Sequence, residues 1–208
     1  LYGATLGLKH FQVKQVTYYH PKLPKSFDGY TITQVSDIHI GSWKGKEGVI
    51  RKMVELVNSQ HADMIVFTGD LVNQRSLELN GFQNTLSGFH ARDGVYSILG
   101  NHDYGTYYHW KNPKEATNNM NELLNREKSM GWQLLNNDHR IIHRGNDSIA
   151  LIGVENDGEP PFSRYADLKK ASKDTKGMFR ILLSHNPTHW KREVLPQTDI
   201  ELMLSGHT

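Results

Sequence analysis

The chain has 208 residues, no cysteine, and 24 basic against 22 acidic side chains, for a formal net charge of +2. The length suits one substantial domain, the weak charge argues against a broad nucleic-acid surface, and the lack of cysteine excludes disulfides and thiolate ligands. No apolar run approaches the roughly 20 residues that cross a membrane, so we expect a soluble domain.

Strand and helix patterns alternate along most of the chain. In chain order, they predict a strand over 30–37, a helix over 46–60, a strand over 63–70, a weaker helix over 76–89, a strand over 94–103, a helix over 113–130, three short strands within 132–154, a helix over 165–173, a strand over 178–185, a helix from about 187 and a strand over 199–207. The strands are too apolar to have one wet face. They indicate an α/β fold with helices covering a largely buried sheet and a hairpin-like section at 132–154.

Polar side chains follow five of these strands directly. They are Asp37 and His39, then Asp70, then Asn101, His102 and Asp103, then His185, and finally His207. Ligands of open α/β sheets bind beyond the carboxyl ends of strands, so we expect these side chains to share one surface. Carboxylate, amide and imidazole ligands without sulfur suit Mn, Fe, Zn or Ni. An aspartate shared by two such ions would hold them about 3.5–4 Å apart, a spacing that clamps a phosphoryl group.

Each cluster taken alone has an ordinary structural explanation. An Asp-x-His pair at a strand end is commonly a cap or a turn, and Gly-Asp is commonly a turn. His185 precedes Asn186 and Pro187, where it could end a strand or cap the next helix. The sequence GNHD at 100–103 is harder to explain by packing. One shared site accounts for all five clusters more economically than five unrelated explanations.

Together the motifs resemble the calcineurin-like metallophosphoesterases. The matching sequences are SDIHIG, FTGDLV, ILGNHD, LLSHNP and LSGHT, which stand in the order of that family and extend over residues 31–208. The resemblance implies a four-layer α/β/β/α sandwich of two mixed sheets with two divalent or trivalent metal ions at the strand ends. It also implies a hydrolase that cleaves a phosphomonoester, phosphodiester or pyrophosphate by attack of metal-bound hydroxide on phosphorus.

The same resemblance assigns roles to the clustered residues. Asp37 and His39 are similar to ligands of the first metal, and Asp70 to the ligand that bridges both. Asn101, His185 and His207 are similar to ligands of the second metal. His102 resembles the family's catalytic histidine, which is not a ligand and stabilises or protonates the leaving oxygen, and Asp103 is expected to orient its ring.

The two ends of the sequence carry further expectations. The family pattern continues as Gly-His-x-His, whereas the sequence stops at Thr208, so we expect residues 1–208 to be a single catalytic domain that lacks its last strands and one histidine ligand. A catalytically inactive metal-binding or partner-binding module is therefore the alternative function. Likeness to bacterial members with exported or membrane-attached catalytic domains predicts a membrane or signal segment before Leu1, the alternative being an artificial boundary.

Substrate contacts are predicted from residues near the catalytic motifs. Tyr104, Tyr107 and Trp110 follow GNHD and could form an apolar wall for a lipid or nucleoside group, or simply pack the loop. Arg164 lies in a loop rich in carboxylates, Gly and Pro and could pair with a phosphate. We expect a phosphorylated small molecule or a lipid-linked substrate, and the balanced charge argues against nucleic acid.

Overall fold

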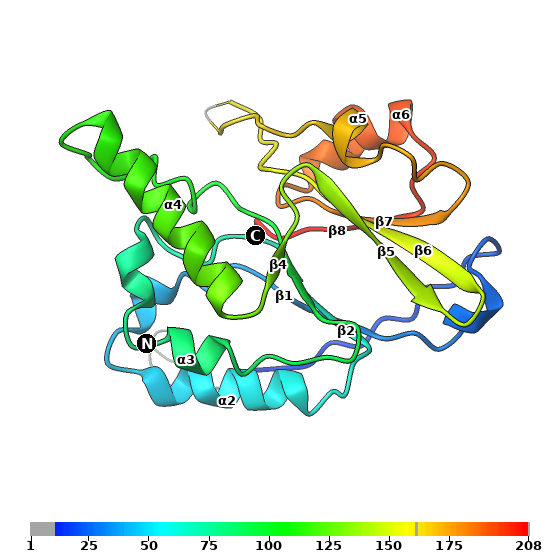
Figure 1. Ribbon diagram of the computed structural model, residues 1–208, viewed down its shortest axis with the longest axis horizontal. Helices are drawn as coiled ribbons and strands as arrows, with labels where there is room; N and C mark the ends of the chain where they lie inside the picture. The colour runs from blue at the N-terminus through cyan, green and yellow to red at the C-terminus, as the bar shows by residue number, and fades with distance from the viewer. Residues whose placement is uncertain (1–10, 161, 208) are drawn as a thin grey trace.

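The computed structural model describes residues 11–160 and 162–207 of the protein (Figure 1). Within these residues, eight strands form two four-stranded sheets, in the orders β1-β2-β3-β4 and β5-β6-β7-β8. The first sheet contains β1 (Ile32–Val35), β2 (Met64–Phe67), β3 (Val95–Ser97) and β4 (Gln133–Leu134). The second contains β5 (Asp138–Arg144), β6 (Asp147–Gly153), β7 (Phe179–Leu183) and β8 (Leu202–Leu204).

The strand directions differ between the two sheets. All three pairings of the first sheet are parallel. In the second sheet β5 and β6 form an antiparallel hairpin, whereas β6, β7 and β8 run parallel. Parallel neighbours bring their carboxyl ends to the same edge of a sheet, which is the edge where the polar motifs lie.

Helices cover the outer face of each sheet. Beside the first sheet are η3 (Ile40–Trp43), α2 (Glu47–Asn58), η4 (Ser76–Leu79), α3 (Gln83–Leu86) and α4 (Pro113–Ser129). Beside the second are α5 (Leu168–Ala171), η5 (Trp190–Val194) and α6 (Leu195–Gln197), and η2 (Lys25–Phe27) precedes β1.

Side chains of the central strands point alternately to the two faces of each sheet and contribute to three apolar cores. On β2, Ile65 and Phe67 pack toward the helices, whereas Met64 and Val66 pack into the core between the sheets. Successive side chains of a strand point to opposite faces, and both faces of this strand are covered. The fully apolar run MIVF is therefore explained by two different cores.

Strand β6 repeats this arrangement in the second sheet. Ile149 and Leu151 face the core between the sheets, and Ala150 and Ile152 face the outer core with α5 and η5. Three cores separate four layers, so the predicted α/β/β/α sandwich is confirmed.

Local sequence signals explain the long helix α4. The Asn112 side chain accepts a hydrogen bond from the Glu115 amide at 3.0 Å, and Pro113 occupies the first turn. Both are favourable at a helix start, because an N-cap side chain satisfies a free amide and proline has no amide to satisfy. The helix ends before Gly131, which has a positive φ of 82°.

Two predicted segments differ in detail from the structure. The helix predicted over 76–89 is split into η4 and α3, because Gly81 adopts a positive φ of 86° between them. The three strands within 132–154 do not form one unit, since β4 joins the first sheet while β5 and β6 form the hairpin of the second. No helix within the described residues is long and apolar enough to cross a membrane.

Candidate metal centre

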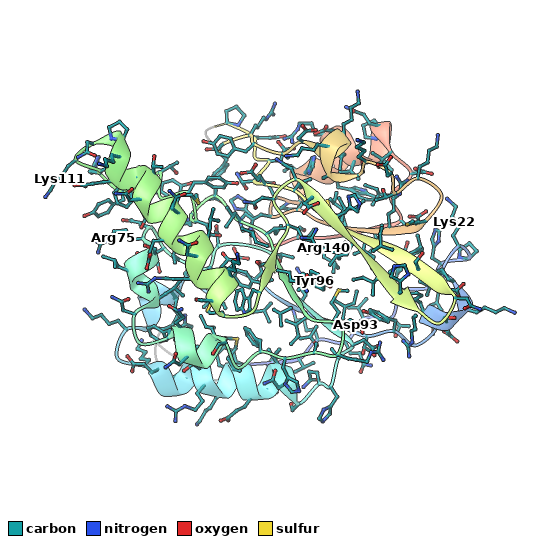
Figure 2. The ribbon with its side chains drawn as sticks, viewed as in Figure 1. Lys22, Arg75, Asp93, Tyr96, Lys111 and Arg140 are labelled. Carbon is teal, nitrogen blue, oxygen red and sulfur yellow. The ribbon has the colours of Figure 1, made fainter. Side chains whose placement is uncertain are left out.

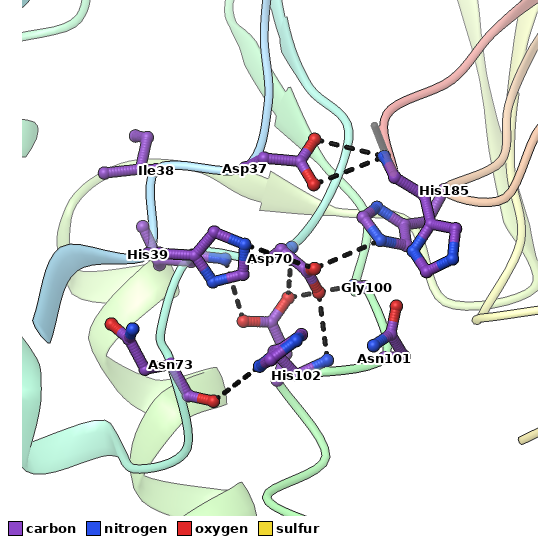
Figure 3. A network of polar contacts seen from close by, with 12 residues as sticks. Asp37, Ile38, His39, Asp70, Asn73, Gly100, Asn101, His102 and His185 are labelled. Carbon is purple, nitrogen blue, oxygen red and sulfur yellow. Dashed lines mark hydrogen bonds and ion pairs between the residues drawn. The ribbon is translucent and has the colours of Figure 1, made fainter. Parts of the chain in front are cut away.

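The polar motifs converge where the carboxyl ends of the two sheets meet (Figure 3). Asp37, Asp70 and Asn101 follow β1, β2 and β3 of the first sheet, while His185 and His207 follow β7 and β8 of the second. The structure therefore brings together residues that are up to 170 positions apart in the sequence.

Asp70 lies at the middle of this group. Its Oδ2 atom is 3.6 Å from His39 Nε2 on one side and 3.3 Å from His185 Nε2 on the other. Two sets of ligand atoms, each within 4.8 Å of one another, have Asp70 in common, one with His39 and His102 and one with His185 and His207. A carboxylate shared by two adjacent ligand sets fits a bridge between two ions.

Two buried ligand atoms in the group have no hydrogen-bond partner among the described residues. They are Asn101 Oδ1 and His185 Nε2. Buried polar atoms normally have partners, because leaving one unsatisfied costs about 1–3 kcal/mol. Both atoms are metal-ligand types, so the residues present fit a bound cation.

The protonation of His185 also suits ligation. Its Nδ1 atom is 2.7 Å from the carbonyl oxygen of Thr68. A carbonyl oxygen only accepts, so Nδ1 carries a proton and the lone pair of a neutral ring lies on Nε2, which faces Asp70.

The charges of His185 and Asp70 favour a positive charge between the two side chains. Burial disfavours the charged form of His185, but the Asp70 carboxylate, 3.3 Å from Nε2, outweighs it and raises the pKa of the imidazole. Burial acts against ionised Asp70 as well, and the contact with His185 outweighs it to lower the pKa of the carboxyl. A position that holds a proton between these groups also attracts a metal cation.

Asp37 lies at the edge of the group. Its carboxylate accepts hydrogen bonds from the His207 amide at 3.2 and 3.1 Å. It lies outside both of the ligand sets centred on Asp70. The assignment of Asp37 to the first metal therefore stays a prediction.

Several candidate ligands have left-handed backbone conformations. The φ angles are 52° for Asp37, 44° for His39, 59° for Asp70 and 60° for His207. Such a conformation costs on the order of 1–3 kcal/mol for a non-glycine residue and persists where the surroundings impose it. Here backbone hydrogen bonds impose it, since the Asp37 amide donates to Gly69 and the His39 amide donates to Asp70, each at 3.0 Å.

Gly100 allows the loops to approach each other closely. A Cβ atom on Gly100 would overlap the Asp70 carboxylate and lie 2.6 Å from the Asp70 amide nitrogen. The backbone at this position must therefore lack a side chain for Asp70 to keep its place.

The role predicted for Asp103 as the group that orients the His102 ring is wrong. The Asp103 carboxylate is fully buried and accepts hydrogen bonds from four backbone amides, those of Asp70, Leu71, Val72 and Gly100, at 2.8–3.1 Å. The ring of His102 instead contacts the carbonyl oxygen of Asn73 at 2.7 Å through Nδ1. Burial, together with the charge of Asp70, raises the pKa of Asp103 to about 7. Asp103 joins the two loops that carry the ligands.

Two of the residues predicted to contact substrate, Tyr104 and Arg164, have their polar groups in contact with other parts of the chain. Tyr104 is half-buried, with its hydroxyl group 3.2 Å from Glu155. Arg164 donates to the carbonyl oxygen of Gly158 at 3.0 Å. Their predicted substrate contacts stay predictions.

Trp110 lies away from the clustered ligands. Its Nε1 atom donates to the Gly105 carbonyl at 2.8 Å, and it lines a separate hollow of about 360 Å³ with Arg75, Tyr108 and Lys111. Figure 2 shows Arg75 and Lys111 beside the amino-terminal end of α4. A contact between Trp110 and a substrate at the ligand group also stays a prediction.

Of the residues predicted to contact substrate, Tyr107 touches both Asn101 and His102. Its hydroxyl oxygen accepts a hydrogen bond from Asn101 Nδ2 at 2.9 Å, and its ring centre is 4.6 Å from that of His102. The sequence shows the aromatic run but does not show which of its members turns toward Asn101.

Sequence reasoning missed two other features, one beside the ligand group and one separate from it. The ring of Phe162 packs edge-on against His207 with 4.8 Å between centres, so the loop after β6 borders the ligand group. A separate cluster joins Asp157, His189 and Glu193, with His189 Nε2 at 3.1 Å from each carboxylate. Arg192 pairs with Asp157, so a guanidinium group already neutralises one of the two carboxylates.

Comparison with known proteins matches residues 30–208 to the family described as "Calcineurin-like phosphoesterase". A Danio rerio "Transmembrane protein with metallophosphoesterase domain" is 33% identical over 217 residues, covering 100% of this chain and 46% of the relative. The "UDP-2,3-diacylglucosamine pyrophosphatase LpxG" of Chlamydia trachomatis is 28% identical over 214 residues, covering 83% of this chain and 63% of the relative.

A solved structure agrees in fold. Haemophilus influenzae NAD nucleotidase (NadN) superposes with a TM-score of 0.57 at 14% identity, over 86% of this chain and 38% of that one. The chain spans about half the length of several curated relatives that it matches.

Proposed function

The chain belongs to the calcineurin-like phosphoesterase family, and we propose that it hydrolyses a phosphoester or pyrophosphate bond at a two-metal centre. The observation that carries the proposal is the shared position of Asp70 between two sets of ligand atoms. His39, Asp70 and Asp37 would hold the first ion, and Asp70, Asn101, His185 and His207 the second. Bound Mn, Fe, Zn or Ni ions would activate water and neutralise charge on the phosphoryl oxygens.

His102 is proposed to act on the leaving group. The carbonyl oxygen of Asn73 accepts from Nδ1 at 2.7 Å, so Nδ1 keeps its proton and Nε2 is the nitrogen that can exchange one. The ring is half-buried and stands edge-on to His39, with 4.7 Å between centres. In the imidazolium form, Nε2 can donate a proton to an oxygen that leaves phosphorus.

The proposed substrate is a phosphorylated small molecule or a lipid-linked pyrophosphate. The pyrophosphatase named for the Chlamydia relative supports the second class. A nucleic-acid substrate is disfavoured, because the net charge is +2 and such substrates require many phosphate contacts.

Membrane association of the full-length protein is proposed from relatives named as transmembrane proteins. Separation of membranes from soluble protein, followed by detection of this domain with an antibody, tests it. Recovery entirely in the soluble fraction would refute it.

The proposed activity is tested by two substitutions. Asp70→Asn should remove most bound Mn and abolish hydrolysis of bis(p-nitrophenyl) phosphate and of a pyrophosphate diester, because an amide supplies one ligand oxygen and no charge. His102→Ala should keep both ions, measured by elemental analysis, and slow turnover about 10²–10⁴-fold. Asp28→Asn, which alters an exposed carboxylate, is the control.

The outcomes separate the enzyme from its alternative. An active Asp70→Asn protein would contradict the two-metal scheme. If the unaltered chain binds two ions but hydrolyses neither substrate nor p-nitrophenyl phosphate, the inactive metal-binding module becomes the better description.

A further inference from the structure

Asn101 has its two amide atoms in different environments. Nδ2 donates a hydrogen bond to the hydroxyl oxygen of Tyr107 at 2.9 Å, whereas Oδ1 is buried and has no partner among the described residues. Asn101 is only 4% exposed, so water has little access to its amide.

The orientation of this amide matters because its two ends differ chemically. The oxygen can bind a cation, whereas the nitrogen carries two protons and no available lone pair. Turned by 180° about χ2, Asn101 would present its NH₂ group in place of the ligand oxygen. A tyrosine hydroxyl group can donate or accept, and in the orientation present Tyr107 accepts from Nδ2, which anchors the nitrogen end and leaves Oδ1 free to bind a cation.

We propose that Tyr107 is a positioning residue whose hydroxyl group holds the Asn101 amide with Oδ1 directed to the second metal ion. The proposal rests on the two-metal function proposed above. It gives Tyr107 a role different from the apolar substrate wall expected from the sequence, because the hydroxyl group carries the effect and the ring does not.

Tyr107 suits this role by its placement in the chain. It follows Asn101 by six residues, and its ring also contacts His102 with 4.6 Å between centres. The residue is 45% exposed, so removing its hydroxyl group leaves no cavity in a core. The neighbouring Tyr108 provides a matched control, because its hydroxyl group contacts Arg75 at 3.3 Å.

The first experiment measures Mn²⁺ affinity by equilibrium competition with a chelator, without substrate, for the unaltered chain, Tyr107→Phe and Tyr108→Phe. Groups that orient metal ligands typically contribute 10–100-fold to metal affinity. We expect Tyr107→Phe to weaken one of the two Mn²⁺ sites about tenfold and to leave the other within twofold. Tyr108→Phe should leave both unchanged. Thermal unfolding monitored by circular dichroism verifies that all three proteins are folded.

A second arm separates positioning from general damage to the loop. In Asn101→Asp, both ends of the side chain are ligand oxygens, so either end can bind the ion and anchoring of one end by Tyr107 matters less. Adding Tyr107→Phe to Asn101→Asp should therefore change Mn²⁺ affinity less than twofold. A tenfold loss in this background would show that the hydroxyl group acts otherwise and would overturn the proposal.

The remaining outcomes are also decisive. If the unaltered chain binds two ions and Tyr107→Phe binds both equally well, the inference about Tyr107 fails while the proposed function stands. If the unaltered chain binds no Mn²⁺, the two-metal function fails and the positioning role fails with it. If it binds a single ion, equal affinity of Tyr107→Phe for that ion overturns the positioning role, and a tenfold loss supports it.

Discussion

Glu127 is a carboxyl group enclosed between α4 and the first sheet. Glu127 is 1% exposed. Its Oε2 atom accepts a hydrogen bond from the Ser97 hydroxyl at 2.5 Å, and Oε1 has no hydrogen-bond partner among the described residues. Burial raises the pKa of Glu127 from the usual 4.5 to about 8, against the opposing effect of the Ser97 hydrogen bond. The folded chain therefore keeps the carboxyl group protonated at pH values where the unfolded chain has lost the proton.

The sign of the resulting pH dependence follows from proton counting. Between about pH 4.5 and pH 8 the folded state binds one proton more at Glu127 than the unfolded state, so this residue's contribution to stability falls as pH rises. The two pKa values correspond to a loss on the order of 4 kcal/mol between pH 4 and pH 8. Glu127→Gln is neutral at all pH values and should not show this loss.

Urea unfolding at pH 5, 6, 7 and 8 tests this reasoning. We expect the stability of Glu127→Gln relative to the unaltered chain to increase over this series, reaching an excess of several kcal/mol at pH 8. Glu122→Gln, at an exposed position of the same helix, should show only a small dependence. A constant difference between Glu127→Gln and the unaltered chain from pH 5 to 8 would refute the burial argument.

Three other substitutions test the close approach at Gly100, a helix glycine and the Asp103 contacts. Gly100→Ala should destabilise the fold by about 1–3 kcal/mol and release bound Mn, because its Cβ would displace Asp70; retention of two ions by elemental analysis would contradict this. Gly48→Ala, in α2 with open space around it, should instead raise the unfolding free energy by about 0.5–1 kcal/mol in urea. Asp103→Asn should lower the free energy of unfolding by about 2 kcal/mol, because the new NH₂ group would face backbone amides, which are also donors. Relief of the repulsion from Asp70 offsets part of this loss. An unchanged urea midpoint would argue against the four-amide contact.

The sequence predicts the layers of the fold well, for a local reason. Strands that are apolar at every position, such as MIVF at 64–67, require cover on both faces; helices supply it on one face and the second sheet on the other. Each cluster of candidate ligands follows a predicted strand, which is why the common edge could be predicted. Pairing between strands is not a local property, so the sequence does not reveal that β4 belongs to the first sheet.

The contacts around the ligands were harder to predict because they depend on loop conformation. Nothing in GNHD indicates that Asp103 turns toward four amides while His102 turns toward Asn73. Glu127, in contrast, did leave a signal. It follows Leu123 by four residues on α4, and both are buried, so helical spacing places this carboxyl group on the apolar face.

The geometry of the candidate centre depends on how the two sheets pack together. The first sheet supplies Asp70, while the second supplies His185 and His207. His185 crosses to the first sheet through its contact with the Thr68 carbonyl at 2.7 Å, and the His207 amide crosses to Asp37. These hydrogen bonds join the sheets at the ligands themselves, and Met64 and Val66 hold the sheets apart in the core beneath. Because packed cores resist changes in volume, the distance between the two ligand sets is set by the inter-sheet core as well as by the loops that carry them.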